Sequence, residues 1–349
     1  HVSNVQRYCN NAKVIAASPV NPKNKEFLNE NGVELHFDHY HQMIKEPNLD
    51  AVIIASPTAF HFDHILLAAK AGKHIFCEKP FALNLQQAES MLEAAQSANI
   101  IHYLNHNYRR CPAIVLAKKM ISEGKLGRIY HLRSSYQQDW LANPDTQMGW
   151  QLDRELSGGG PHIDLGSHCI DLAHHLVGNI SSISCLQAHF VKERTNSNNT
   201  KQPINVDDAS IMSVEFDNGA VGSFECTRYA SGRKNRNYFE INGSEGSLVF
   251  DLEKMNELEY FSSNDPSQEQ GFRKIIVTEP NHDYVKNWWP PGHIIGYEHT
   301  FVHSAADFIN SIVANNSITP NFQDGVNCMR VLDAGNLSAK TGQRVSIAH

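Results

Sequence analysis

The chain lacks the sequence features that mark several large classes of protein. Its net charge is −7 and it has no block of basic residues, which argues against a nucleic-acid-binding surface. It has no apolar run of about 18 residues, so no membrane span is predicted. Because neither a C-x-x-C pair nor an H-E-x-x-H motif occurs, we expect no metal site. No secretory signal peptide is recognisable at the start.

The composition that remains is that of an ordinary globular protein. Its 349 residues are too many for one average domain, so we expect two. Hydrophobic residues make up 41% of the chain and charged residues 19%, which is enough apolar material for a large core. The seven cysteines are odd in number and scattered, which predicts reduced, buried thiols and a cytoplasmic protein.

The N-terminal part of the chain alternates apolar strands with helices. Strands are predicted at residues 12–18, 33–37, 51–55, 73–77 and 100–104, and helices at 2–8, 24–31, 39–45, 60–71 and 85–98. This order predicts an α/β domain with a doubly wound, Rossmann-type parallel sheet over residues 1–107. The pattern also implies a strand and a G-x-G-x-x-G loop, roughly 15–25 residues, upstream of His1.

After residue 107 the pattern changes to strands joined by tight turns. Strands are predicted at residues 127–138, 181–192, 209–216, 221–229, 238–242, 247–251 and 258–261, and helices at 163–177, 298–314 and 326–338. We therefore expect an α+β domain over residues 108–349, an open and mainly antiparallel sheet with helices on one face. Its C-terminal helices could pack back on the first domain. Residues 211–216 alternate between an apolar and a mixed face.

Two neighbouring strand ends of the first domain carry polar residues. Ser56-Pro57-Thr58 follows one strand, and Glu78-Lys79-Pro80 follows the next. Ligands of doubly wound sheets bind at the carboxyl ends of the strands, so both are candidate sites. Pro80 restricts Lys79 to an extended conformation. The alternatives are that Thr58 merely caps the next helix and that Lys79 belongs to a surface ion pair.

A glycine triplet, Gly158-Gly159-Gly160, leads into the helix predicted at residues 163–177. Glycines let a backbone approach a ligand closely. Asp164 and His168 are four residues apart and would share one face of that helix. Apolar residues surround the helix, so we expect it to be largely buried and its polar groups to need partners. The alternative is a flexible glycine loop followed by an amphipathic helix whose polar residues face solvent. A histidine can take a proton near neutral pH, and we favour a functional site.

Four motifs in order resemble one family. They are Ser56-Pro57-Thr58-x-x-His61, Gly72-Lys73-His74-x-x-Cys77-Glu78-Lys79-Pro80, Asn107-Tyr108-Arg109-x-x-Pro112 and Gly158-Gly159-Gly160-x-x-x-Asp164-x-Gly166-x-His168-x-x-Asp171. The set resembles the Gfo/Idh/MocA family of nicotinamide-dependent sugar and polyol oxidoreductases. Residues 233–243 and 288–301 resemble the branch of sugar and inositol dehydrogenases that contains levoglucosan dehydrogenase.

This resemblance implies roles for the matching residues. Lys79 would hydrogen-bond the reacting hydroxyl, His168 would be the general base, and Asp164 would bind substrate and polarise His168 or Lys79. The residues expected to line the cofactor are Ser18, Ser56, Thr58, His61, Glu78 and Lys79, with Asn107 and Arg109 near the nicotinamide.

The sequence leaves open which nicotinamide cofactor is used and which residues bind the substrate. The second strand of the family pattern ends in Ser18, where an NAD site would have an acidic residue for the ribose diol. Lys23 is nearby but no arginine is, so both NAD and NADP are candidates, with NAD favoured. Trp140 and Trp150 could be platforms for a sugar ring or ordinary core residues. Further polar candidates for substrate binding are Gln138, Arg154 and His293.

Together these features predict an NAD(P)-dependent oxidoreductase that transfers a hydride between the cofactor and a secondary hydroxyl of a sugar, glycoside or cyclitol. One alternative is an NAD-dependent glycosidase that works by transient oxidation. The other is a dinucleotide-binding sensor without catalysis, against which the set of Lys79, Asp164 and His168 argues. The resemblance implies a homodimer or homotetramer built through the open sheet.

Overall fold

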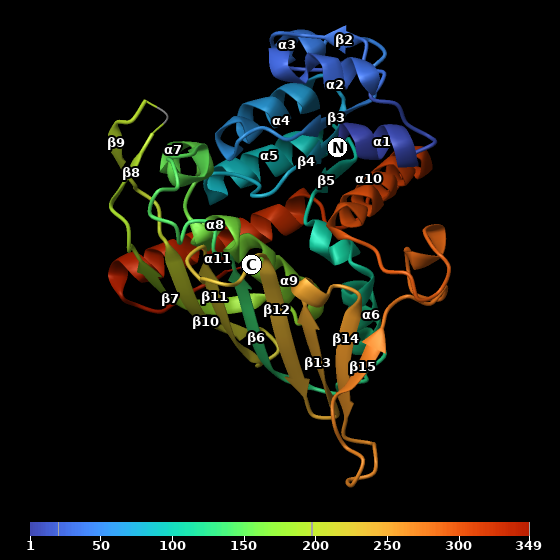
Figure 1. The fold of residues 1–349 in the computed structure, drawn as a ribbon, viewed down its shortest axis with the longest axis vertical. Helices are drawn as coiled ribbons and strands as arrows, with labels where there is room; N and C mark the ends of the chain where they lie inside the picture. Colours follow the sequence, from blue (N-terminus) through green and yellow to red (C-terminus); the bar gives the residue numbers. More distant parts are fainter. Residues whose placement is uncertain (20, 197, 349) are drawn as a thin grey trace. The chain divides into compact units, whose positions relative to one another are not determined.

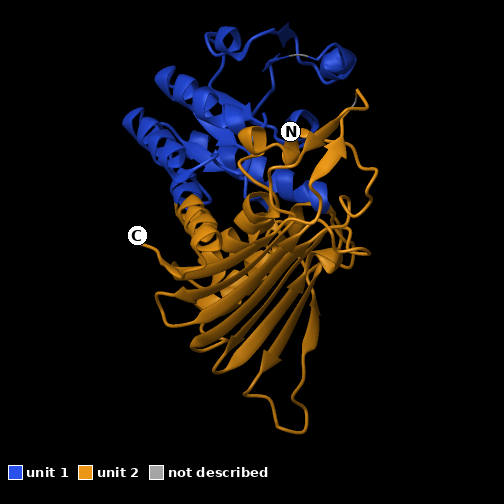
Figure 2. Ribbon diagram, turned by 90° about the vertical axis from the view of Figure 1, so that its left-hand side faces the viewer, with its two compact units in different colours: residues 1–107, 297–326 blue, residues 108–296, 327–349 orange. Residues whose placement is uncertain are grey.

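The computed structural model describes residues 1–19, 21–196 and 198–348. The chain divides into two compact units, coloured separately in Figure 2. Unit 1 comprises residues 1–107 and 297–326, and unit 2 comprises residues 108–296 and 327–349.

Unit 1 consists of parallel strands and helices. Its strands are β1 (Ala16–Ala17), β2 (Leu35–His36), β3 (Ala51–Ile54), β4 (His74–Cys77) and β5 (His102–Leu104). Its helices are α1 (Val2–Tyr8), α2 (Lys25–Glu30), α3 (Tyr40–Met43), α4 (His61–Lys70), α5 (Leu85–Ser97) and α10 (Tyr297–Ala314). Every strand pair in it is parallel, as the alternating sequence predicts. The predicted α/β domain with parallel strands is therefore confirmed.

The strands of unit 1 form two sheets rather than one. β1 pairs with β2, and β3, β4 and β5 form a separate sheet in that order. A cavity of about 660 Å³ is lined by residues of β1 and β3 and by residues of α1 and α10. The strand predicted at residues 12–18 is only two residues long in the structure, Ala16–Ala17. Among the described residues this strand pairs with β2 alone.

Local signals explain the longer helices of this unit. The side chain of Asn84 accepts a hydrogen bond from the Gln87 amide over 2.9 Å, which caps the first turn of α5. Buried residues recur along α5 at helical spacing, namely Ala88, Met91, Leu92 and Ala95. Thr58 is not the predicted cap, because the N-cap position of the short 3₁₀ helix Thr58–Phe60 is Pro57 and that of α4 is Phe60.

Unit 2 contains a sheet of nine strands in the order β15-β14-β13-β12-β6-β11-β10-β7-β16 (Figure 1). The strands are β6 (Ile129–Gln137), β7 (Ile180–Ala188), β10 (Ala209–Phe216), β11 (Val221–Thr227), β12 (Arg236–Gly243), β13 (Gly246–Asp251), β14 (Glu257–Ser262), β15 (Arg273–Ile276) and β16 (Val345–Ser346). Among the strands that the structure describes in this sheet, only β6 and β11 pair in parallel, so the sheet is mainly antiparallel, as predicted. A separate hairpin joins β8 (Glu193–Thr195) to β9 (Lys201–Pro203).

Helices lie on one face of this sheet. They are α6 (Pro112–Ser122), α8 (Pro161–Asp164), α9 (Gly166–Leu176) and the part of α11 (Phe322–Thr341) that belongs to unit 2. The short helix α7 (Arg154–Ser157) precedes α8. α8 contacts β10 and β11, and α9 contacts β6 and β11 (Figure 1). On β10 the side chains of Met212, Val214 and Phe216 are buried, whereas Ile211 on the other face is 55% exposed. The predicted apolar and mixed faces are therefore confirmed.

The helix predicted at residues 163–177 is interrupted. α8 ends at Asp164, α9 begins at Gly166, and Leu165 lies between them. The amide of His168 donates to the carbonyl of Leu165 over 3.1 Å. The amide of Cys169 donates to the same carbonyl over 3.3 Å, and Leu165 itself has helical dihedral angles of −88° and −37°. The backbone therefore stays close to helical across Leu165, and a helical segment that carries both Asp164 and His168 is present as predicted.

Candidate functional site

The glycine triplet builds the start of α8. Gly158 ends α7 with a φ of 84°, a conformation that glycine adopts without strain. The carboxylate of Asp207 accepts hydrogen bonds of 2.8 Å from the amides of Gly160 and His162. A Cβ on Gly160 would lie 1.9 Å from the backbone oxygen of Asp207. In the described residues the close approach that the glycines allow is thus made to Asp207, and it fixes the segment that carries Asp164.

Asp164 pairs with a buried arginine that sequence reasoning did not identify. The NH2 group of Arg228 donates to Asp164 Oδ2 over 2.6 Å. Arg228 is 1% exposed and the side chain of Asp164 is 29% exposed. The Arg228 guanidinium also lies 5.2 Å from the centre of the Trp140 ring, within range of a cation–π interaction.

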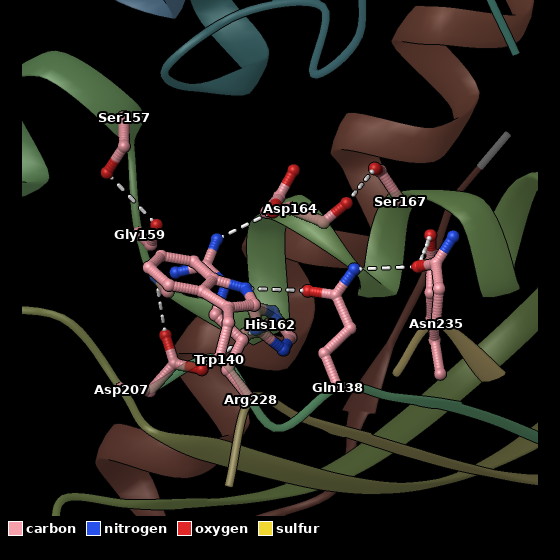
Figure 3. A network of polar contacts seen from close by, with 12 residues as sticks. Gln138, Trp140, Ser157, Gly159, His162, Asp164, Ser167, Asp207, Arg228 and Asn235 are labelled. Atoms are coloured by element: carbon pink, nitrogen blue, oxygen red, sulfur yellow. Dashed lines mark hydrogen bonds and ion pairs between the residues drawn. The ribbon is translucent and has the colours of Figure 1, made fainter. Parts of the chain in front are cut away.

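A chain of hydrogen bonds starts at Trp140 (Figure 3). Its indole Nε1 donates to Gln138 Oε1 over 2.9 Å, and Gln138 Nε2 donates to Asn235 Oδ1 over 2.8 Å. An indole nitrogen can only donate, so the first bond fixes which end of the Gln138 amide is oxygen. The second bond then fixes the orientation of the Asn235 amide.

The same chain continues to two tyrosines. Tyr136 Oη donates to Asn235 Oδ1 over 2.8 Å, and Tyr108 Oη lies 2.7 Å from Tyr136 Oη. Because the single proton of Tyr136 goes to Asn235, Tyr108 is the donor in the second bond. The His168 ring lies 4.6 Å from the Tyr108 ring and 5.5 Å from the Tyr136 ring, between centres, and His168 is 4% exposed. His168 is therefore packed among aromatic rings whose hydroxyls are fixed.

In unit 1, Glu78 follows β4 and is engaged by two side chains. His1 Nε2 lies 2.6 Å from Glu78 Oε1, and Asn105 Nδ2 donates to the same oxygen over 2.8 Å. Burial acts to raise the pKa of Glu78, but the hydrogen bonds from His1 and Asn105 and the charge of Lys79 outweigh it and lower the pKa overall. Glu78 is thus held as a carboxylate next to Lys79, which is partly exposed.

His61 joins the two predicted strand ends. Its Nε2 lies 2.9 Å from the carbonyl of Ser56, and its Nδ1 lies 3.2 Å from the carbonyl of Phe81. The ring is 1% exposed, and burial lowers its pKa although both carbonyls oppose this. The neutral ring carries a single N–H, so it donates to one of these two carbonyls at a time. His61 therefore lies between the segments that follow β3 and β4 and links them through that contact. The side chain of Thr58 is also buried.

Ser18 provides a test of whether a dinucleotide fits this unit. It directly follows β1. Its hydroxyl is buried and has no hydrogen-bond partner in residues 1–19, 21–196 and 198–348. A buried hydroxyl without a partner at the carboxyl end of a parallel strand fits a ligand that brings its own polar groups, such as a ribose. The residues present are thus compatible with the cofactor.

Two residues expected near the nicotinamide have structural contacts. Asn107 is 3% exposed and its Nδ2 donates to Thr300 Oγ1 over 2.8 Å, inside unit 1. Arg109 belongs to unit 2, where its Nε and NH2 donate to the two carboxylate oxygens of Asp171 over 2.9 and 2.6 Å. The Arg109 guanidinium is thus engaged by the carboxylate of Asp171 on α9 in a buried, bidentate pair. For this reason Arg109 is not part of the proposed cofactor site.

The remaining substrate candidates do not join the Asp164 and Trp140 contacts in the described residues. Trp150 is 41% exposed in a short 3₁₀ helix. Arg154 is exposed and its Nε donates to the carbonyl of Asn205 over 3.0 Å. His293 is exposed, and its Nδ1 lies 2.9 Å from the carbonyl of Pro290 in the same segment.

Within the described residues no group of three or more His, Cys, Asp or Glu side chains could hold a metal ion. In the same residues no helix is long and apolar enough to cross a membrane.

A parallel-stranded unit followed by a mainly antiparallel sheet, with Asp164 and His168 on the helices that cover it, is the architecture of a dinucleotide-dependent oxidoreductase. Comparison with known families agrees. An oxidoreductase family model with an NAD-binding Rossmann fold matches residues 1–106, and the GFO/IDH/MocA C-terminal domain model matches residues 114–249. The chain belongs to the Gfo/Idh/MocA family of oxidoreductases.

Individual relatives are similar over most of the chain. Levoglucosan dehydrogenase of Pseudarthrobacter phenanthrenivorans is 38% identical over 87% of this chain and 81% of its own length. The scyllo-inositol 2-dehydrogenase (NAD(+)) of Bacillus subtilis is 30% identical over 71% of this chain and 69% of its own length. A solved structure of levoglucosan dehydrogenase in complex with NADH and levoglucosan superposes with a TM-score of 0.91, at 38% identity, over 96% of this chain and 89% of that chain.

Proposed function

We propose that the chain transfers a hydride between NAD and a secondary hydroxyl of a cyclic sugar, glycoside or cyclitol. The observation that carries this proposal is the cluster of unit 2 in which Trp140 and Asp164 share Arg228 as a neighbour and Gln138 is bonded to Trp140 (Figure 3). Trp140 is 41% exposed. An exposed aromatic face beside a carboxylate and an amide suits a sugar ring, which is apolar on its faces and carries hydroxyls at its edge.

The residues of the chain supply the proton chemistry. His168 accepts the proton of the reacting hydroxyl, and Asp164 accepts a hydrogen bond from the substrate. Lys79 donates to the reacting oxygen and stabilises the negative charge that develops there. The nicotinamide ring, when bound, supplies the hydride acceptor.

For the cofactor, we propose that Ser18, Ser56 and Glu78 make polar contacts with it. His61 and Asn107 support this site through the structural contacts that they make. NAD is proposed over NADP because lysines such as Lys23, but no arginine, lie near Ser18 in the sequence, and a 2′-phosphate is usually recognised by an arginine.

The substrate class follows from the relatives. The names of the two dehydrogenases specify an anhydrosugar and an inositol. Both are cyclic polyols, and we propose a substrate of that kind for this chain.

We also propose a cytoplasmic homo-oligomer. All seven cysteines are free, and six of them are buried, which suits a reducing compartment. On the open face of the sheet Leu186 is 66% exposed and lies opposite Ile211 in the β7–β10 pair. Exposed apolar pairs on a sheet face support a contact with a second copy. Sedimentation of the purified protein would give its oligomeric state.

The test is a screen of anhydrosugars, hexoses and inositols with NAD⁺ and with NADP⁺, followed by the absorbance of the reduced cofactor. We expect reduced cofactor to accumulate with at least one cyclic polyol, faster with NAD⁺. Cleavage of a glycoside without net reduction would instead favour a glycosidase that works by transient oxidation. Dinucleotide binding without turnover of any substrate would favour a sensor.

A further inference from the structure

Arg228 stands out among the buried side chains of unit 2. It directly follows β11, is 1% exposed, and donates through NH2 to Asp164 Oδ2 over 2.6 Å. Its Nε and NH1 are buried and have no hydrogen-bond partner in the part of the chain that the structure describes. A buried cation is costly unless an opposite charge lies close to it, so the position of this guanidinium depends on Asp164.

A second buried arginine shows what a purely structural role looks like here. Arg194 is 3% exposed, and its two terminal nitrogens donate to the backbone carbonyls of Leu141, Asn143, Pro144 and Thr146. The same nitrogens also reach Tyr229 Oη over 3.2 Å, so this arginine ties loops together through its terminal nitrogens, while its Nε has no partner in the described residues. Arg228 instead has one side-chain hydrogen bond among those described, and that bond goes to the carboxylate proposed to bind substrate.

Trp140 limits the movement of Arg228. The indole ring lies 5.2 Å from the guanidinium carbon, and the backbone amide of Leu141 donates to the Arg228 carbonyl over 3.3 Å. The ring itself is fixed by its hydrogen bond to Gln138. The guanidinium is thus packed against an aromatic face on one side and bonded to Asp164 on the other.

We propose that Arg228 is a positioning residue that occupies Asp164 Oδ2 and sets the orientation in which the Asp164 carboxylate meets the substrate. This inference rests on the proposed function, because it assigns Asp164 to substrate binding. Arg228 touches neither substrate nor cofactor in this account. Its effect should therefore depend entirely on the presence of the Asp164 carboxylate.

The experiment compares R228M with a matched arginine variant. Arg236 on β12 also pairs with a carboxylate, Asp251, over 2.9 Å and lies 4.3 Å from the ring of Tyr238. It has the same two kinds of contact without any contact to Asp164. R228M should lower kcat/KM for the sugar by roughly 100-fold with an unchanged KM for NAD, as expected when a reacting group is misplaced. R236M should keep the wild-type value within about 3-fold.

A double-mutant cycle separates positioning from a general structural effect. If Arg228 acts through Asp164, R228M should lower kcat no further in a D164N background, because the group that it orients has already been changed. A structural role would make the two losses multiply. If R228M does not fold, R228K takes its place, with an expected loss of roughly 10-fold that also disappears in the D164N background.

The outcomes are distinguishable. A folded R228M with wild-type kcat/KM, or losses that multiply with D164N, would overturn the positioning role and leave the proposed function standing. A wild-type protein that reduces no cofactor with any cyclic polyol would overturn the proposed function and this inference with it.

Discussion

The Asp207 carboxylate accepts a hydrogen bond of 2.8 Å from the amide of His162, 45 residues away in the sequence. Its other oxygen accepts from Gly160, so one side chain satisfies two amides at the start of α8. Asp164 is the last residue of that helix. The position of Asp164, the residue proposed to bind substrate, therefore depends on Asp207, which lies in the connection that precedes β10.

Replacement of Asp207 should therefore destabilise unit 2. D207A leaves two buried amides without an acceptor and should lower the free energy of unfolding by about 2–4 kcal/mol. D207N keeps an acceptor oxygen and should cost about half as much. Urea denaturation measures both. D153N is the control, because its amide oxygen can still accept from Glu155, as Asp153 does now over 3.0 Å. A D207A protein as stable as D153N would contradict this role.

Gly160 should tolerate no side chain. A Cβ there would lie 1.9 Å from the backbone oxygen of Asp207, which cannot move aside as a flexible side chain could. We expect G160A to lower the free energy of unfolding by about 3 kcal/mol. G271A is the matched control, since a Cβ on Gly271 meets no atom within 4 Å. Equal unfolding midpoints for the two variants would show that the close approach does not matter.

The free energy of unfolding should fall at mildly acidic pH because His102 is buried in its neutral form. Burial lowers its pKa to about 4, against a partial opposing effect of Asp324, and its Nδ1 accepts a 3.2 Å hydrogen bond from the Phe322 amide. Between the unfolded pKa of about 6.5 and the folded pKa, the unfolded state binds more protons. Stability should therefore decrease as the pH falls through this window, by about 3 kcal/mol in total.

The variant H102N can keep the acceptor but cannot be protonated there, so its stability should vary less over the same pH range. Urea denaturation at several pH values from neutral to about 4 gives this slope. The exposed His41 provides the control variant H41N, which should retain the wild-type slope. An H102N slope equal to that of H41N would contradict the assignment.

Lys79 is expected to act in the chemical step. K79A should lower kcat by roughly 100-fold or more while NAD still binds, because the reacting oxygen loses its charged donor. Steady-state kinetics and a fluorescence titration with NADH separate these two effects. K70A, at an exposed lysine of α4, is the control. Turnover of K79A at the K70A level with every active substrate would remove Lys79 from the reaction.

The fold could be predicted wherever local periodicity reports burial. β10 alternates buried and exposed side chains over its whole length, and the sequence places it correctly. β15 could not be predicted, because most of its side chains are exposed and its existence depends on pairing with β14. Helix α6 was not predicted, although Ile114, Ala117 and Met120 are buried at helical spacing.

The site could be predicted in its chemical groups but not in their partners. Asp164 and His168 stand out by residue type and spacing. Arg228 lies 64 residues after Asp164 and has no local signal, because the pair forms only when the end of β11 lies beside α8. The same is true of Asn235, which joins Gln138 to Tyr136 across strands far apart in sequence.

The pH dependence of sugar oxidation in H168N tests the central claim most directly. If His168 is the base, kcat/KM of the wild type should fall on the acid side as the imidazole becomes protonated. H168N should lose roughly 100-fold or more of this activity and should lack the acid limb, while H131N, a change on β6, should keep both. An H168N protein that retains the wild-type rate and the same acid limb would contradict the account.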